Sequence, residues 1–297
     1  MRRVLVIAGP TASGKSSFGV LCAKKYNGEI ISGDSIQVYK GLNIGSAKVS
    51  EEEKGGVVHH LIDIKDASDF YSVKEFQEKG RELIEAISNR GKLPIVVGGT
   101  GLYIKALLYD YKFYDEEKKD EPFDDLSNED IYNILLKEDP DCLNNIHINN
   151  RKRLVRALNI LRKHDLGISK IKATQEHVLL YDAKIVGLTK SREKLYESIE
   201  NRVDKMIEDG LLEEIQGLLD SGISFDNQSM QGIGYKEFRP YFNHEKSLED
   251  CINDVKRNTK HFAKRQYTWF NNQMSVDWYE DKDRALIDID KWIIKDN

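Results

Sequence analysis

One segment constrains the fold of this chain more than any other: Gly9-Pro10-Thr11-Ala12-Ser13-Gly14-Lys15-Ser16. It matches the phosphate-binding pattern G-x-x-x-x-G-K-[ST] at every fixed position. The apolar run from Val4 to Ala8 predicts a strand before it, and the segment from Ser17 to Lys25 predicts a helix after it. Such a loop directs backbone N–H groups at an anion. We therefore expect a bound polyphosphate, with Lys15 as a point charge and Ser16 as a hydroxyl ligand for Mg²⁺.

Further strands are predicted at Glu29–Ser32, Leu93–Val97 and Lys184–Leu188, with helical patterns between them. This alternation predicts an α/β fold of the P-loop NTPase-like kind, a parallel sheet flanked by helices. In such sheets the loops that follow the carboxyl ends of the strands form the ligand crevice. Asp34 and Thr100 follow two of these strands. We therefore expect both to lie beside the phosphate-binding loop.

The chain has 297 residues, which is longer than one average domain. Residues 1–110 are expected to form the first part of the core, and residues 143–297 to complete it and add basic C-terminal helices. Between them, residues 111–142 are rich in acidic side chains and include the helical pattern Asn128–Glu138. We expect this stretch to be a small, mainly helical insertion that begins as an acidic surface connection.

Composition indicates an ordinary globular protein, with 40% hydrophobic and 32% charged residues. No apolar run approaches the roughly 18 residues of a membrane span, so we expect no membrane association. The N-terminus shows no signal-peptide pattern, and the three cysteines form no C-x-x-C pair. We therefore expect a cytoplasmic protein with reduced cysteines, and we expect it to be a monomer.

Two basic segments stand out against a net charge of −5. The first runs from Arg151 to Lys163 and the second from Val255 to Met274, and neither contains an acidic residue. Such segments are often only solvated helix faces. They are also the electrostatic signature of a nucleic-acid contact, so both interpretations remain open.

The phosphate-binding loop alone favours a kinase or an NTPase. Those enzymes usually hold Mg²⁺ with a second carboxylate at the end of an apolar strand, whereas Leu93–Val97 runs into Gly98-Gly99-Thr100. The missing acid, together with Asp34 and the basic segments, favours a site that holds a diphosphate as a leaving group. A nucleotide or small-metabolite kinase is the alternative. A non-catalytic RNA-binding protein would not need Asp34 beside a phosphate-binding loop.

The chain resembles the bacterial tRNA dimethylallyltransferases from Val4 to about Phe270. The resemblance rests on ordered motifs: the phosphate-binding loop, Asp34-Ser35-Ile36-Gln37-Val38-Tyr39, His59-His60-Leu61-Ile62-Asp63, Val97-Gly98-Gly99-Thr100-Gly101-Leu102-Tyr103, Arg153-Leu154-Val155-Arg156-Ala157-Leu158, Gly232-Ile233-Gly234-Tyr235-Lys236 and Ala263-Lys264-Arg265-Gln266-Tyr267-Thr268-Trp269-Phe270. It implies transfer of a dimethylallyl group from dimethylallyl diphosphate to N6 of adenosine 37 of tRNA, with release of pyrophosphate.

The resemblance also implies catalytic roles. Asp34 would accept a proton from the poorly nucleophilic adenine amine. Lys15 would offset the charge of the departing pyrophosphate, with Mg²⁺ as cofactor, and Thr100 would donate a hydrogen bond to the diphosphate. Arg202 resembles a family arginine that reaches the diphosphate.

The expected partner is the anticodon arm of tRNA, whose base must leave its stack to react. Residues expected to contact the tRNA are Asp34, Ser35, Ile36, Gln37, Lys152, Arg153, Arg156, Gln231, Lys236 and Arg265. The chain departs from common family motifs at Gly45-Ser46-Ala47-Lys48-Val49 and at His147-Ile148-Asn149-Asn150. The acidic insertion contains few arginines, so we assign no site residue to it.

Overall fold

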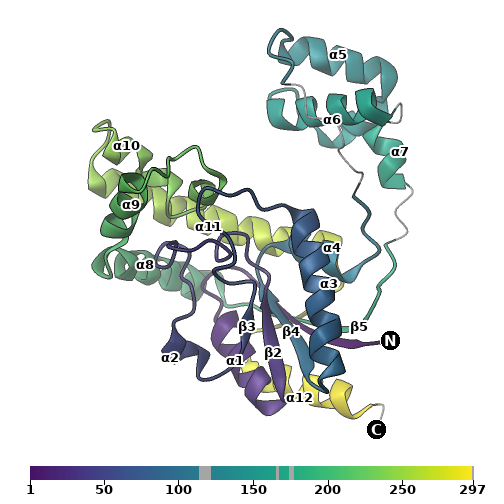
Figure 1. Ribbon diagram of the computed structural model, residues 1–297, viewed down its shortest axis with the longest axis vertical. Coiled ribbons are helices and arrows are strands. Elements are labelled where there is room, and N and C mark those ends of the chain that lie inside the picture. Colours follow the sequence, from purple (N-terminus) through teal and green to yellow (C-terminus); the bar gives the residue numbers. More distant parts are fainter. Residues whose placement is uncertain (114–121, 165–166, 174–176, 296–297) are drawn as a thin grey trace. The chain divides into compact units, whose positions relative to one another are not determined.

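A computed structural model describes residues 1–113, 122–164, 167–173 and 177–295 (Figure 1). The chain divides into two compact units. The first combines Met1–Tyr109 with Leu179–Asn297, and the second is Asp110–Val178.

The first unit is built around a parallel sheet. Its strands, within the described residues, are β1 (Arg3–Ala8), β2 (Gly28–Ser32), β3 (His59–His60), β4 (Leu93–Gly98), β5 (Asp182–Leu188) and β6 (Asp277–Tyr279). They form a six-stranded sheet in the order β3-β2-β4-β1-β5-β6, and every pairing is parallel. The predicted α/β fold is therefore confirmed. Strand β6, which pairs with β5, was not predicted from the sequence.

Helices of the first unit cover both faces of this sheet, and further helices form the second unit. The α-helices of the described residues are α1 (Lys15–Lys25), α2 (Glu51–Lys54), α3 (Val73–Asn89), α4 (Gly101–Leu108), α5 (Asn128–Glu138), α6 (Arg151–His164), α7 (Ile168–Ala173), α8 (Arg192–Glu208), α9 (Leu211–Asp220), α10 (Arg239–Phe242), α11 (Leu248–Gln273) and α12 (Lys282–Ile294). Short 3₁₀ helices lie at η1 (Pro140–Asn145), η2 (Gln228–Gln231) and η3 (Lys236–Phe238).

Side chains of β1 point alternately to the two faces of the sheet, so this one strand contributes to the hydrophobic core on each face. Leu5 and Ile7 point to one side and pack with α1 and α12, whereas Val4 and Val6 point to the other side and join the core that includes α3 and α4. All four side chains are fully buried. A central strand that is apolar throughout is typical of a parallel sheet covered on both faces.

Strand order brings the expected loops together. Strands β2, β4 and β1 are neighbours, so the loops after their carboxyl ends meet at one sheet edge. These loops carry Asp34, Thr100 and the phosphate-binding loop, respectively. Gly14 adopts a left-handed conformation with φ 87° directly before α1, which L side chains rarely adopt. The fold therefore places the loop at a helix N-terminus, as the motif requires.

Helices α8 and α11 pack against each other in the first unit. Ion pairs join Lys256 to Asp204 and Lys260 to Glu200 across this interface. The two lysines belong to the second basic segment of the sequence, so part of its charge is neutralised within the protein. Most of this segment lies on α11, one of the basic C-terminal helices expected from the sequence.

The second unit is helical and has its own core. Ile131 and Leu135 of α5 pack with Leu154 and Leu158 of α6. The helix predicted at Asn128–Glu138 is confirmed. The unit runs from Asp110 to Val178 and thus extends beyond the expected end at residue 142, because α6 buries its apolar face against α5. Residues 114–121, part of the expected acidic connection, lie outside the described residues.

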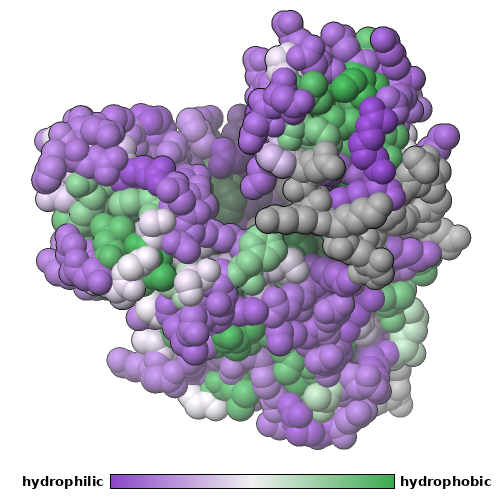
Figure 2. All heavy atoms as spheres, turned by 45° about the horizontal axis from the view of Figure 1, so that its top comes forward, coloured by the Kyte–Doolittle hydropathy of each residue, from purple (hydrophilic) through white to green (hydrophobic). Residues whose placement is uncertain are grey.

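Hydrophilic residues dominate the faces visible in Figure 2, with smaller hydrophobic areas between them. In the part of the chain that the structure describes, every helix is too short or too polar to span a bilayer.

Candidate active site

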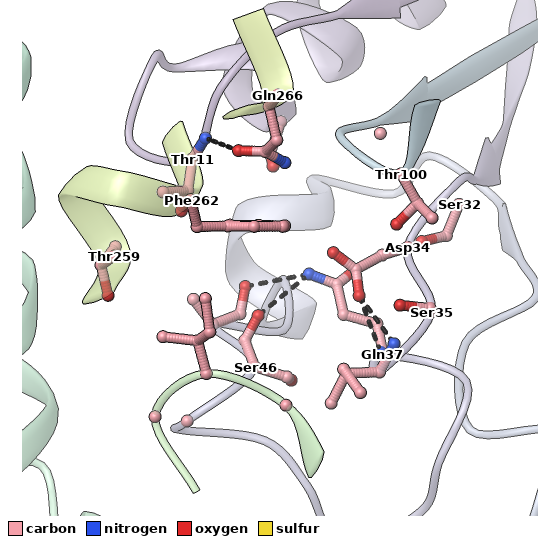
Figure 3. A pocket seen from close by; sticks show the side chains of 18 of the residues that line it. Thr11, Ser32, Asp34, Ser35, Gln37, Ser46, Thr100, Thr259, Phe262 and Gln266 are labelled. Carbon is pink, nitrogen blue, oxygen red and sulfur yellow. Dashed lines mark hydrogen bonds between the residues drawn. The ribbon is translucent and has the colours of Figure 1, made fainter. Parts of the chain in front are cut away.

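A cavity of about 450 Å³ lies within the first unit, at the carboxyl edge of the sheet. Loops after β1, β2 and β4 line it together with one face each of α8 and α11. Figure 3 shows side chains from these segments pointing toward a common space. Residues expected to act in catalysis or binding that line this cavity are Thr11, Lys15, Ser16, Asp34, Ser35, Ile36, Gln37, Thr100, Arg202, Gln231, Lys236 and Arg265.

The phosphate-binding loop folds as its motif predicts. Its lysine bends back over the loop, and Lys15 Nζ donates a hydrogen bond to the carbonyl oxygen of Pro10 at 3.2 Å. Ser16 follows at the start of α1, and its side chain makes no hydrogen bond with the described residues. Ser13 is buried, and its Oγ finds no hydrogen-bond partner in that same part of the chain. The loop therefore presents unused polar groups at a helix N-terminus, where an anion is favoured.

Two cations face each other in the cavity. The pKa of Lys15 is lowered to about 8, mainly by burial and then by the nearby Arg202, whereas Asp34 acts in the opposite direction. Burial also lowers the pKa of Arg202, which Asp34 and Glu53 raise. Among the described residues, Arg202 has no hydrogen-bond or ion-pair partner. The two positive charges are partly desolvated, and no carboxylate among the described residues contacts Arg202 directly. Together they should bind an anion strongly.

This arrangement predicts how anion affinity depends on pH. Below pH 8 Lys15 already carries its proton, whereas above pH 8 binding must first add one. A bound anion raises the pKa of Lys15, so affinity for pyrophosphate should fall by up to about 10-fold per pH unit above 8. Calorimetric titrations with pyrophosphate at several pH values test this. Lys15→Arg, whose guanidinium stays charged, is the control and should lack this loss; equal profiles for both proteins would contradict the prediction.

Asp34 lies just beyond the end of β2 and uses one carboxylate oxygen to shape its own loop. Asp34 Oδ1 accepts hydrogen bonds from the backbone N–H groups of Ile36 at 2.8 Å and Gln37 at 3.2 Å. The second oxygen, Oδ2, has no partner among the described residues. The carboxylate thus caps a turn and keeps one oxygen available in the cavity (Figure 3). A turn cap and a proton acceptor both fit this geometry.

The loop after β4 supplies Thr100, which precedes α4. Its side chain makes no capping hydrogen bond, although it stands at the helix N-cap. The hydroxyl group lines the cavity and remains available as a donor to a ligand. Thr100 therefore lies where the sequence placed it, beside the phosphate-binding loop.

Residues 35–37 form part of the cavity wall. The hydroxyl group of Ser35 has no partner among the described residues. The side chain of Gln37 is engaged: its Nε2 donates to the carbonyl oxygens of Ser46 and Ala47, each at 3.3 Å, and its Oε1 accepts from Ser32 Oγ at 3.3 Å. Ser35 thus offers a free polar group, whereas Gln37 holds the loop at residues 46–47 in place.

The remaining expected contacts divide between the two units. Gln231, Lys236 and Arg265 line the cavity and are exposed. The amide of Gln231 is engaged with the carbonyl oxygen of Phe225 at 2.5 Å. In the second unit, exposed positions of α6 carry Lys152, Arg153 and Arg156, opposite the apolar face of that helix.

Of the cavity residues on α11, the expected site residues include only Arg265; they omit Val255, Thr259, Phe262 and Gln266. Gln266 is only 7% exposed and makes hydrogen bonds to two loops of the site. The signal was present, because Val255, Thr259, Phe262 and Gln266 recur at helical spacing and define one face of α11. That face is the one turned to the cavity.

The fold and cavity define the chain as an α/β protein with a phosphate-binding loop, in which a carboxylate faces the anion site. Comparison with known proteins then gives the family. A sequence model of the family described as IPP transferase matches residues 37–273. The chain belongs to this family.

Individual relatives agree over nearly their whole length. A tRNA dimethylallyltransferase of Anoxybacillus flavithermus is 45% identical over 289 residues, covering 96% of this chain and 93% of that protein. The tRNA dimethylallyltransferase of Enterococcus faecalis is 46% identical over 288 residues, covering 94% of this chain and 92% of that protein.

Solved structures are similar in fold as well. The tRNA delta(2)-isopentenylpyrophosphate transferase of Staphylococcus epidermidis has a TM-score of 0.74 at 42% identity, covering 99% of this chain and all of that one. A eukaryotic dimethylallyltransferase, described as acting on tRNA, has a TM-score of 0.88 at 31% identity and covers 99% of this chain and 80% of that one.

Proposed function

We propose that the protein transfers a dimethylallyl group from dimethylallyl diphosphate to N6 of adenosine 37 in tRNA and releases pyrophosphate. The observation that carries the proposal is the cavity lined by Lys15, Arg202 and Asp34, in which one Asp34 carboxylate oxygen has no partner among the described residues. The family membership and the names of the relatives support the same activity.

The first requirement is to hold the diphosphate while it leaves. As the C1–O bond of the allylic diphosphate breaks, negative charge grows on the departing oxygen. Lys15, Arg202 and the amides at the start of α1 would offset that charge in a partly desolvated site, where hydrogen bonds to charged groups are strongest. The hydroxyl group of Thr100 would donate a further hydrogen bond.

The residues present are compatible with Mg²⁺. The described residues contain no cluster of three or more His, Cys, Asp or Glu side chains that would form an all-protein metal site. Mg²⁺ commonly takes only one or two protein ligands, with phosphate oxygens and water completing its octahedron. The hydroxyl group of Ser16, which lines the cavity and has no hydrogen-bond partner in the described part of the chain, fits that role. Bound there, the ion would supply further neutralisation of the diphosphate charge.

The second requirement is to remove a proton from the acceptor. The lone pair of an exocyclic adenine amine is delocalised into the ring, so N6 attacks weakly unless it loses a proton as the new bond forms. Asp34 Oδ2 would accept that proton while N6 bonds to C1 and pyrophosphate departs. Oδ1 keeps the loop in shape meanwhile, so the carboxylate stays oriented.

The third requirement is to hold the RNA while one base leaves its stack, which costs a few kcal/mol. Phosphate contacts supply that energy in nucleic-acid complexes. We propose that exposed basic residues of α6 (Lys152, Arg153, Arg156) and Arg265 of α11 make such contacts. Ser35 would face the edge of the extruded base.

A substitution on α6 tests the phosphate contacts. Arg156→Ala should weaken tRNA binding several-fold at low salt and lower the slope of log affinity against log salt by about one unit, as expected for one lost phosphate contact. Arg162→Ala on the same helix is the matched control, because Glu138 already holds that guanidinium through hydrogen bonds of 2.8 and 3.0 Å. Equal salt slopes for Arg156→Ala and wild type would remove Arg156 from the RNA interface.

The transfer reaction is directly testable. Incubation with labelled dimethylallyl diphosphate, Mg²⁺ and unmodified tRNA should label the tRNA in the absence of ATP. Failure to label tRNA, combined with ATP-dependent phosphorylation of a small molecule, would instead establish the kinase alternative.

A further inference from the structure

Gln266 joins the two loops between which an anion would bind. Its Oε1 accepts a hydrogen bond from the backbone N–H of Thr11 at 3.0 Å (Figure 3), and its Nε2 donates one to the carbonyl oxygen of Gly99 at 2.9 Å. A Cβ atom on Gly99 would lie 2.2 Å from Gln266 Nε2, so this close approach requires glycine. A single side chain of α11 therefore ties the phosphate-binding loop to the loop after β4.

This contact removes one anion donor from the phosphate-binding loop. Backbone N–H groups in such loops normally point at phosphate oxygens, and each one adds a hydrogen bond to the ligand. The N–H of Thr11 is taken by Gln266. The amide oxygen of Gln266 also places lone pairs there, which repel a phosphate oxygen. The Thr11 end of the loop is therefore unfavourable for a phosphoryl group.

The opposite end of the loop is favourable. Lys15 and Ser16 lie at the N-terminus of α1, where the helix dipole and free N–H groups attract an anion. In Figure 3 the Thr11–Gln266 hydrogen bond and the carboxylate of Asp34 lie on different sides of the Phe262 ring. A phosphate chain that extended from Lys15 toward Thr11 would meet the amide oxygen of Gln266.

We propose that Gln266 is a specificity-determining residue that limits the bound anion to two phosphates and excludes triphosphates. It does so by sealing the Thr11–Gly99 end of the anion site. A loop motif shared with triphosphate-binding proteins is thereby restricted to a diphosphate. The inference relies on the proposed function for the identity of the diphosphate ester, whereas its test uses inorganic anions and requires no transfer.

Calorimetric binding of pyrophosphate and tripolyphosphate in the presence of Mg²⁺ tests this inference. Gln266→Ala frees the N–H of Thr11 and opens space, so the tripolyphosphate-to-pyrophosphate affinity ratio should rise at least about 10-fold, the effect of one charge-assisted hydrogen bond. Gln266→Glu keeps an oxygen at the same place and adds negative charge, so the ratio should fall below that of the wild type.

The matched control is Gln273→Ala on the same helix, whose amide oxygen accepts from Lys105 outside the cavity. It should leave the ratio unchanged. A role of Gln266 in loop stability alone would change both affinities together and leave the ratio constant in both variants, and that result would overturn the inference. If the alanine variant does not fold, an unchanged tripolyphosphate-to-pyrophosphate ratio in Gln266→Glu would by itself overturn the inference. Failure of tRNA labelling with a changed ratio would reject the proposed transfer and retain the anion-length limit.

Discussion

Replacing Asp34 with asparagine should slow prenyl transfer by about 100-fold or more while pyrophosphate affinity changes only a few-fold. Asparagine keeps the Oδ1 atom that accepts hydrogen bonds from the N–H groups of Ile36 and Gln37, so the turn is preserved. It replaces the unpartnered oxygen with an NH₂ group that cannot take a proton at neutral pH. The defect should therefore appear in the chemical step.

Single-turnover measurements with tRNA and a saturating prenyl donor isolate that step. Asp34→Ala, which also removes the turn cap, provides the comparison: it should match the asparagine variant in rate but lose more thermal stability. A near-normal single-turnover rate for Asp34→Asn would reject Asp34 as the proton acceptor and leave it as a turn cap.

Replacing Arg202 with methionine should weaken pyrophosphate binding by about 10- to 100-fold, the range expected for hydrogen bonds to charged groups. The same change should not lower the stability of the free protein, because Arg202 lacks a partner among the described residues and its charge lowers the pKa of Lys15. The pH at which pyrophosphate affinity begins to fall should accordingly move upward from about 8.

Calorimetry and thermal unfolding check both halves of this prediction. Arg192→Met is the matched control on the same helix, because its guanidinium lies over the ring of Tyr196 and does not line the cavity. A variant at position 202 that loses stability in the absence of anions, with unchanged pyrophosphate affinity, would show that Arg202 has a structural role. The predicted result, weaker anion binding without a loss of stability, is common when a charge in a binding site serves function and does not stabilise the fold.

Sequence reasoning brought some side chains of the cavity together because it depends on strand direction alone. In a parallel sheet, the loops after neighbouring strands meet at one edge, so Lys15, Asp34 and Thr100 could be placed together without coordinates. The glycine positions of the loop also constrain its conformation, because Gly14 adopts a left-handed backbone that other residues rarely adopt.

That reasoning cannot predict contacts between segments that are far apart in the sequence. Gln266 joins Thr11 across more than two hundred positions, and its helical spacing with Phe262 shows only that the two share a face of α11, not which loops that face contacts. The sequence likewise does not show that Lys256 and Lys260 of α11 face acidic partners on α8. The second unit continues to Val178, past residue 142, because α6 buries its apolar face against α5, and such packing cannot be read from the sequence.

The central claim is that a loop of the nucleotide-binding type here holds a diphosphate that departs as a neighbouring carboxylate deprotonates the acceptor. The most direct measurement counts pyrophosphate released against dimethylallyl groups gained by tRNA, with Mg²⁺ and without ATP. The account predicts one pyrophosphate per modified tRNA and almost no release when tRNA is omitted. Release of orthophosphate, or a strict requirement for ATP, would contradict it.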